Sequence, residues 1–525
     1  MLNPKQESVY KSVNIKEEKT YLLHGVTGSG KTELYMRWIS DCIKMGKKAL
    51  MLVPEISLTP QITAVFYARF KESIAVLHSR LSIQEKYDEW KRIINGDVKI
   101  VVGARSAIFA PIDNLGIIII DECHEQSYKQ TNNPKYDAID LAKRRCHTYK
   151  CSLVLGSATP NADDYYKACN GEYVLLELPL RANGKKMPEC KVIDMREELK
   201  KGNRTPISKA LEEKIISCYK NNEQSILFLN RRGYSSFVQC RGCGEVVKCP
   251  HCDVSLTYHS RTNTLKCHYC GYQIANVTKC DKCGSDKIRF VGSGTEKIEE
   301  AVKKILPEAR IIRLDMDTVS KIEDYEVAYH DFKNHKADIM IGTQMVTKGL
   351  DFENVTLVGV LNADLAMHYP TFDANQVAFN LIEQVSGRAG RSLLDGEVII
   401  QTYDPDNYVI KAAKNHDYEG FYKKEILFRK AAFMPPFAEV LELEIKGKNL
   451  SIVKKEAYHI RDALVEVKDK SRILGPSEAF IFKKKDIYHY IIQIQAVEDR
   501  VLDKLNYIYP LYQDNKDVSL SITRK

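Results

Sequence analysis

Two series of short apolar runs constrain the fold of this chain more than any other feature. Each run has the length of a strand, and helical patterns lie between successive runs. Buried runs that alternate with helices are typical of parallel sheets covered by helices. Two series therefore predict two α/β lobes. The first series is Tyr21–His24, Ala49–Val53, Val98–Val102, Ile117–Ile120 and Leu153–Leu155, and the second is Ile226–Leu229, Ile311–Leu314, Ile339–Ile341, Thr356–Val360 and Val398–Gln401.

The segments outside these series suggest further divisions. One segment breaks the strand–helix rhythm with several prolines, glycines and charges, which is typical of a connection. A Cys-rich stretch lacks the strand–helix–strand pattern, and the last part carries strands at Val440–Ile445 and Tyr488–Gln495. We expect lobe 1 at 1–176, an interlobe linker at 177–205, lobe 2 at 206–237 and 291–405, a zinc-binding insertion at 238–290, and a C-terminal α+β domain at 406–525.

Composition excludes several classes of protein. No apolar run reaches the length of a membrane span, and the first residues lack the apolar core of a secretory signal. We therefore expect a cytoplasmic protein without a membrane partner. The formal charge of +9 over 525 residues permits a nucleic-acid groove without requiring one. The odd total of 15 cysteines argues against a disulfide framework.

A phosphate-binding loop follows the first strand. Its eight residues fit the pattern G-x-x-x-x-G-K-[ST], and a helical stretch follows them. The backbone N–H groups of such a loop face phosphate, Lys31 would reach the β- and γ-phosphates of ATP, and Thr32 would hold Mg²⁺. A glycine-rich turn that matches by chance is the alternative, and the flanking strand and helix argue against it. The nucleotide-binding residues are Gly25, Val26, Thr27, Gly28, Ser29, Gly30, Lys31 and Thr32.

Two carboxylates end the buried strand Ile117–Ile120, at the sheet edge where ligands bind. Asp121 would complete the Mg²⁺ shell, and Glu122 would orient or deprotonate the attacking water. An acidic strand cap is the alternative, and it weakens beside a phosphate loop. Cys123 carries no chemistry that we can assign. Gln6 is suited to adenine recognition, although an exposed helical glutamine explains it nearly as well.

The order of the remaining motifs resembles that of superfamily 2 helicases, with the DExH box at Asp121–His124. Arg388 and Arg391 lie three residues apart, on one helix face, and would reach the γ-phosphate if lobe 2 closed on lobe 1. Solvent exposure or structural pairing is the alternative for these arginines. The motifs beyond the ATP site are Gly156–Pro160, Gly342–Asp351 and Gln384–Arg391.

Loops at the strand ends would bind DNA through phosphate contacts, which give affinity without reading sequence. Arg105, Thr159 and Thr343–Lys348 offer suitable donors. Tyr128 and Tyr136, near cations, are candidates for base stacking, with a surface tyrosine as the alternative for either.

Four C-x-x-C pairs lie between Cys240 and Cys283, and three of them are followed directly by glycine. Two such knuckles form one tetrahedral zinc site, so four predict two Zn²⁺ per chain, with iron–sulfur as the competitor. The 14 residues between Cys252 and Cys267 favour an inner site inside an outer one, although sequential pairing stays open. The outer site would hold Cys240, Cys243, Cys280 and Cys283, and the inner site Cys249, Cys252, Cys267 and Cys270.

The motor with this eight-cysteine insertion resembles the primosomal protein N′ family, the bacterial replication-restart DNA helicases. The resemblance implies 3′→5′ unwinding of forked DNA, nested zinc pairing, and partners that include primosome proteins, single-stranded DNA-binding protein and the replicative helicase loader. Members commonly carry a DNA-binding region before the motor, and because the phosphate loop begins at Gly25 here we expect that region to be missing from this sequence. Members also commonly carry an acidic residue where Cys123 stands. The matching motifs are Gly25–Tyr35, Val53–Gln61, Gly103–Pro111, Asp121–Gln130, Gly156–Pro160, Phe228–Ser235, Gly342–Phe352, Gln384–Arg391 and Gly475–Phe480.

Two other functions compete. Another superfamily 2 DNA translocase would share the motor but lack this zinc arrangement. A zinc-containing, ATP-responsive DNA-binding scaffold for primosome assembly would have lost hydrolysis, against which the intact Lys31, Asp121, Glu122, Arg388 and Arg391 argue.

Overall fold

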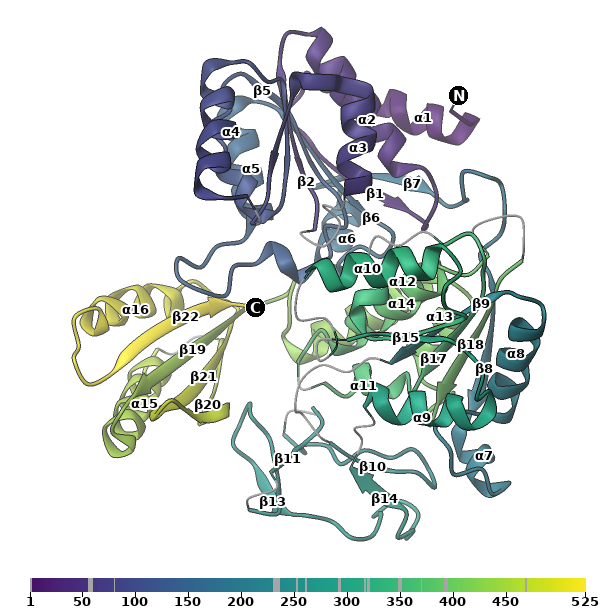
Figure 1. Ribbon diagram of the computed structural model, residues 1–525. Coiled ribbons are helices and arrows are strands. Elements are labelled where there is room, and N and C mark those ends of the chain that lie inside the picture. Colours follow the sequence, from purple (N-terminus) through teal and green to yellow (C-terminus); the bar gives the residue numbers. More distant parts are fainter. Residues whose placement is uncertain are drawn as a thin grey trace. The chain divides into compact units, whose positions relative to one another are not determined.

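The computed structural model divides into two compact units (Figure 1). The first unit comprises Met1–Pro188, Thr347–Glu353 and Ser386–Asp395, and the second comprises Glu189–Val346, Asn354–Val385 and Gly396–Lys525. The structure describes residues 2–54, 60–79, 81–229, 237–251, 254–259, 262–290, 294–315, 318, 322–347, 352–369, 371–390, 395–467 and 470–525.

The first unit is built on a seven-stranded sheet with the order β3-β4-β2-β5-β6-β1-β7. Every adjacent pair is parallel, as the buried apolar runs predicted. The strands are β1 (Thr20–Gly25), β2 (Lys48–Leu52), β3 (Ile74–Leu77), β4 (Ile100–Gly103), β5 (Leu115–Ile120), β6 (Ser152–Ser157) and β7 (Val174–Leu178). The helices are α1 (Pro4–Ser12), α2 (Lys31–Lys44), α3 (Pro60–Phe70), α4 (Ile83–Asn95), α5 (Ala138–Tyr149) and α6 (Ala162–Cys169).

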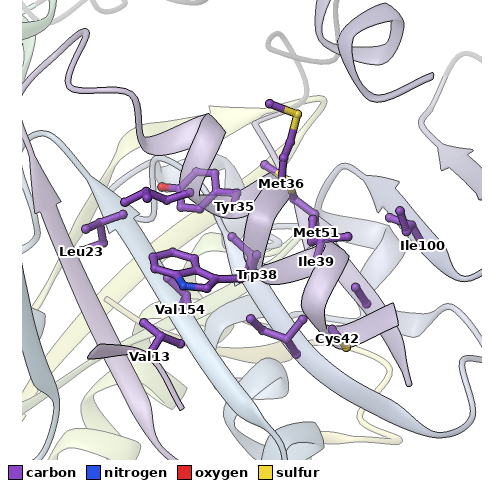
Figure 2. Packing of buried hydrophobic residues seen from close by; sticks show 14 of the residues in the cluster. Val13, Leu23, Tyr35, Met36, Trp38, Ile39, Cys42, Met51, Ile100 and Val154 are labelled. Atoms are coloured by element: carbon purple, nitrogen blue, oxygen red, sulfur yellow. The ribbon is translucent and has the colours of Figure 1, made fainter. Parts of the chain in front are cut away.

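Helix α2 anchors the core of this unit (Figure 2). Its inward face recurs at helical spacing through Tyr35, Trp38 and Cys42, all of which are buried. They pack in one cluster with strand residues such as Leu23 and Met51. Full burial of each large side chain stabilises the fold by about 1.5–3 kcal/mol. This packing fixes α2 on the sheet, and therefore fixes the loop that precedes it.

The second unit contains a six-stranded parallel sheet with the order β15-β16-β9-β17-β18-β8. Strand β8 lies within residues 177–205, which we expected to be a linker, and it pairs with β18. The strands are β8 (Glu189–Asp194), β9 (Gln224–Leu229), β15 (Ile311–Leu314), β16 (Ile339–Gly342), β17 (Val355–Leu361) and β18 (Glu397–Thr402). The helices are α7 (Met195–Lys200), α8 (Lys209–Lys220), α9 (Thr295–Ile305), α10 (Ile322–Lys333), α11 (Asp364–Met367), α12 (Ala374–Ser386), α13 (Tyr408–Lys414) and α14 (Tyr418–Ala432).

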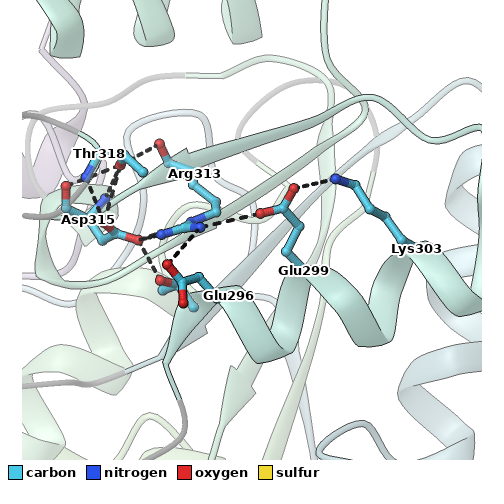
Figure 3. A network of polar contacts seen from close by, with 7 residues as sticks. Glu296, Glu299, Lys303, Arg313, Asp315 and Thr318 are labelled. Carbon is cyan, nitrogen blue, oxygen red and sulfur yellow. Dashed lines mark hydrogen bonds and ion pairs between the residues drawn. The ribbon is translucent and has the colours of Figure 1, made fainter.

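A polar network fixes the end of β15 in this sheet (Figure 3). The Arg313 guanidinium donates to Asp315 at 3.1 Å and to Glu299 of α9 at 3.5 Å. Asp315 also accepts from the backbone N–H of Thr318 at 3.0 Å. Because opposite charges and backbone groups satisfy one another here, the strand end and α9 are held together.

Two smaller parts complete the second unit. The Cys-rich insertion pairs β10 with β14 and forms a three-stranded sheet, β11-β12-β13, and the C-terminal domain has the antiparallel order β20-β21-β19-β22. No helix in the described ranges is long and apolar enough to cross a bilayer. These elements are β10 (Val238–Cys240), β11 (Thr257–His259), β12 (Thr264–Lys266), β13 (Gln273–Ala275), β14 (Ile288–Phe290), β19 (Glu439–Gly447), α15 (Leu450–Val465), β20 (Arg472–Lys484), β21 (Ile487–Ala496), α16 (Arg500–Ile508) and β22 (Ser519–Arg524).

Candidate nucleotide site and zinc clusters

The phosphate-loop motif lies between β1 and α2. Gly28 and Gly30 have φ angles of 81° and 84°, a left-handed conformation that disfavours residues with a side chain. The Lys31 ammonium donates to the carbonyl of Gly25 at 2.8 Å, within the loop itself. The loop therefore presents backbone N–H groups and a helix N-terminus, the arrangement that binds phosphate.

Gln6 braces this loop. It is buried, and its side-chain amide donates to the Ser29 carbonyl at 2.8 Å. Its Oε1 atom accepts from the backbone N–H of Asn3 at 2.9 Å, in a capping box at the start of α1. The structure thus rules out an exposed helical glutamine and ties α1 to the loop.

Asp121 lies at the end of β5, inside the first unit. Burial, and secondarily the neighbouring Glu122 carboxylate, raise the pKa of Asp121 to about 6, while Lys31 opposes this shift. The Tyr35 hydroxyl donates to its Oδ1 at 3.0 Å, and the Tyr128 hydroxyl donates to its backbone carbonyl at 2.7 Å. Lys31 and Asp121, 90 residues apart in the chain, therefore act electrostatically on one site.

Glu122 occupies a strained backbone position, with a φ of 46°. Its Oε2 atom is buried and accepts no hydrogen bond from the described residues, although it lies 3.5 Å from Nδ1 of His124. A buried oxygen of this kind is suited to hold a water molecule. The same ring nitrogen of His124 lies 2.7 Å from the Ser157 hydroxyl, which links the DExH box to the motif at Gly156–Pro160.

Cys123, between these groups, is buried, and burial raises the pKa of its thiol well above the usual range. Burial therefore favours the neutral thiol over the thiolate. Sequence reasoning missed Tyr35, although its position four residues after Lys31 on α2 was an available signal.

The segment with the predicted catalytic arginines starts at the end of α12. Residues Ser386–Asp395 belong to the first unit. A Cβ atom on Gly387 would lie 2.9 Å from the Thr27 side chain, so the backbone at this position lies directly against the phosphate loop. Arg388 follows and is almost fully buried. Arg391 lies outside the described residues.

The predicted DNA-contact residue Arg105 binds the loop after the DExH box. Its guanidinium donates to the carbonyls of Ser127 and Lys129 at 3.0 and 2.9 Å, and it lies 5.8 Å from the centre of the Tyr136 ring. These candidates therefore form one cluster. Tyr128 is buried and engaged with Asp121, so it is not a free stacking surface. Of Thr343–Lys348, residue 348 is outside the described part of the chain.

Seven of the eight knuckle cysteines form two clusters, the outer and inner clusters. The ligand atoms of each cluster lie within 4.8 Å of one another. Cys252 lies outside the described residues. The outer cluster is Cys240, Cys243, Cys280 and Cys283, and the inner cluster is Cys249, Cys267 and Cys270.

The sulfur spacings fit zinc. Sγ–Sγ separations are 3.7 and 3.6 Å in the outer cluster and 3.5 Å in the inner one. Four thiolates about 2.3 Å from a tetrahedral zinc lie about 3.8 Å apart, whereas a disulfide is about 2.0 Å long. The glycine after each of three knuckles has a positive φ and donates its N–H to the first cysteine of its knuckle, at 2.8–3.0 Å. Both clusters therefore have the chemistry and spacing of nested zinc sites.

Three protein-family models match the chain, in the order of the phosphate-loop unit, the Cys-rich insertion and the second parallel sheet. The DEAD/DEAH box helicase model matches residues 3–168, the PriA DNA helicase Cys-rich region model matches 249–274, and the helicase conserved C-terminal domain model matches 275–392.

Curated relatives agree along most of the chain. The replication restart protein PriA of Bacillus subtilis is 48% identical over 95% of this chain and 62% of its own length. The proteins of that name from Treponema pallidum and Rickettsia felis are 39% and 38% identical, over 91% and 92% of this chain and 72% and 74% of their own lengths. The chain thus spans less than two thirds of the Bacillus subtilis relative. With its motor motifs and Cys-rich region in this order, the chain belongs to the family of the replication restart protein PriA.

Proposed function

We propose that this chain is an ATP-dependent DNA helicase that moves 3′→5′ and acts at stalled or collapsed replication forks. The observation that carries the proposal is the group of Lys31, Asp121 and Glu122, whose charges act on one another, with the backbone of Gly387 against the same phosphate loop. Phosphoryl transfer needs positioning and charge more than covalent chemistry, and these residues supply both. Membership of the PriA family, whose Cys-rich region model is that of a DNA helicase, supports DNA as the substrate.

Each side chain has a proposed part in the reaction. Lys31 and the loop N–H groups bind the phosphates of ATP. Thr32 and Asp121 would hold Mg²⁺, which when bound would neutralise charge on the transferred phosphoryl group. Glu122 positions the attacking water. Arg388 and Arg391 stabilise charge that develops on the γ-phosphate, so hydrolysis depends on lobe closure and can drive movement along a strand.

The partners follow from the same proposal. Single-stranded and forked DNA would bind the motor, with Arg105 and the loop that it holds among the contacts. Primosome proteins, single-stranded DNA-binding protein and the replicative helicase loader would take part in restart, in the cytoplasm, where the replicative helicase is reloaded.

The first test is ATP hydrolysis by the purified chain with and without single-stranded DNA. We expect stimulation by DNA, and activity at the background level in Lys31→Ala, which lacks the ammonium that would reach the β- and γ-phosphates. Lys44→Ala, at the opposite end of the same helix and exposed, is the matched control. Absence of DNA stimulation in the wild type would exclude the motor.

Unwinding direction needs a separate test. Partial duplexes with a single-stranded tail on either the 3′ or the 5′ side, and a forked duplex, are compared at saturating ATP. A motor that moves 3′→5′ along the tail meets the duplex only on the substrate with the 3′ tail. Preferential unwinding of that substrate therefore supports the proposed polarity. Equal ATPase stimulation without strand separation would instead favour the ATP-responsive scaffold.

A further inference from the structure

A short strap follows β7 and runs along the phosphate loop; we define it as residues 178–184. The N–H of Val26 donates to the Leu178 carbonyl at 3.1 Å, and the N–H of Ala182 donates to the Gly28 carbonyl at 2.8 Å. A turn closes the strap, with the N–H of Gly184 donating to the carbonyl of Arg181 at 3.0 Å. The strap is therefore hydrogen-bonded to the glycine-rich loop at two positions, Val26 and Gly28.

Arg181 extends from this strap to the segment that carries Arg388. Its Nη1 donates to the Gly390 carbonyl at 3.0 Å, and its Nη2 lies 3.4 and 3.5 Å from the carbonyls of Gly387 and Ala389. The side chain is only 5% exposed. All of these residues belong to the first compact unit.

The chemistry of this contact suits an arginine. The C-terminal end of a helix carries partial negative charge, which favours a cationic donor beside the carbonyls that follow it. Helix α12 ends at Ser386, so these carbonyls are the acceptors that follow it. A planar guanidinium offers five donors in a fixed geometry and can serve several carbonyls at once, whereas an ammonium is a single point.

The carbonyls that Arg181 contacts lie on both sides of Arg388 in the chain. Gly387 precedes Arg388, and Ala389 and Gly390 follow it, so Arg181 fixes the backbone from which the Arg388 side chain starts. The strap also holds the phosphate loop, because the next residue, Ala182, donates its N–H to the Gly28 carbonyl of that loop. The neighbouring pair 181–182 thus sets the position of the Arg388 backbone relative to the loop.

We propose that Arg181 is a positioning residue for ATP hydrolysis, which aligns Arg388 with the phosphate loop without touching the nucleotide. The inference rests on the proposed ATPase function and deepens it by one residue. It predicts that loss of Arg181 slows the hydrolytic step and leaves nucleotide affinity nearly unchanged, since the phosphate-binding N–H groups stay in place.

The test measures DNA-stimulated ATPase and affinity for a fluorescent ADP in the full chain. For Arg181→Gln we expect kcat to fall about 10–100-fold, because misplacing a catalytic group by about 1 Å costs a factor of this order. We expect the Kd for ADP to change less than about threefold. Arg181→Lys should lose less, since it keeps the charge but not the planar donor set. Arg204→Gln, an exposed arginine elsewhere, is the matched control.

A double-mutant cycle separates positioning from general destabilisation. If Arg181 acts through Arg388, the variant with both Arg181→Gln and Arg388→Gln should be no slower than Arg388→Gln alone. Multiplicative losses, a wild-type kcat in Arg181→Gln, or equal losses in kcat and ADP affinity would each overturn the inference. A wild-type chain without ATPase activity would instead overturn the proposed function, so the two failures are distinguishable.

Discussion

Replacing Tyr35 by phenylalanine removes one buried hydrogen bond to the candidate Mg²⁺ ligand. The Tyr35 side chain is fully buried, and its hydroxyl donates to Asp121 at 3.0 Å. A hydrogen bond to a charged group contributes about 1.5–3 kcal/mol. This bond stabilises the ionised form of Asp121, so its loss raises the pKa of that carboxyl further. Since one pKa unit corresponds to about 1.4 kcal/mol, the pKa should rise by about one to two units.

The change in the pKa of Asp121 determines how much of this carboxyl is ionised at each pH. Asp121 has a pKa of about 6 in the intact protein, so about three quarters of it is ionised at pH 6.5. At a pKa of about 7–8 in Tyr35→Phe, only about 3–24% would be ionised at pH 6.5. A protonated carboxyl is a poor Mg²⁺ ligand. The variant should therefore lose activity below neutral pH and recover it above about pH 8.5.

The assay is the pH profile of kcat/KM for MgATP, which reports ionisations of the free enzyme. The acid limb should move to higher pH in Tyr35→Phe. Tyr21→Phe is the matched control, because the Tyr21 hydroxyl is buried in the same unit but accepts from the Asn14 backbone instead. An unmoved acid limb in Tyr35→Phe would refute the reasoning, as would an equal displacement in the control.

Three further predictions follow. Cys240→Ser should lower the zinc content, measured by mass spectrometry of the native chain, from about two ions to about one, because the outer and inner clusters are separate; a fall to none would contradict their independence. Gly387→Ala should lower kcat/KM for ATP about tenfold in the ATPase assay, because its Cβ would lie 2.9 Å from the Thr27 side chain of the phosphate loop and overpacking costs about 1–3 kcal/mol. His416→Gln should destabilise the second unit by about 3 kcal/mol near pH 6, because Glu383 accepts from His416 at 2.9 Å in a buried pair. Hydrogen bonds to Cys190 and Glu383 raise the pKa of His416 to about 11 against the opposing effect of burial, so this stabilisation should be fully present below about pH 6.5 and be lost progressively as pH rises toward 11 in urea titrations.

The sequence revealed central strands better than edge strands. Ile117–Ile120 is buried throughout and reads as an unbroken apolar run. The strands of the lobes and the C-terminal domain that went unrecognised, β3, β7, β8, β20 and β22, all lie at sheet edges. In β8, Cys190 is the buried residue while Glu189 and Lys191 are exposed, so no apolar run marks the strand. An edge strand has one neighbour and keeps polar residues, which resemble those of a linker.

The site divides in a similar way. Lys31 and Asp121 were readable because loop and strand-end chemistry is local in sequence. Tyr35 and Arg181 were not, because their parts depend on partners 86 and 209 residues away, Asp121 and Gly390. An isolated tyrosine or arginine carries no signal of such a partner. Only the folded chain shows it.

The inner zinc knuckle contacts the C-terminal domain, which supplies none of the zinc ligands. Residues 406–525 contain no cysteine, yet β20 meets the knuckle: Ser477 donates to the His268 carbonyl at 2.8 Å, and Lys266 binds Glu478 at 2.6 Å. A zinc ion that binds only the folded knuckle would stabilise that knuckle, and with it the contacts that β20 makes there. The stabilisation is about 1.4 kcal/mol for each tenfold excess of free zinc over its dissociation constant. The stability of the C-terminal sheet should therefore depend on the concentration of free zinc. Zinc depletion should weaken the contacts of a domain that supplies no zinc ligand.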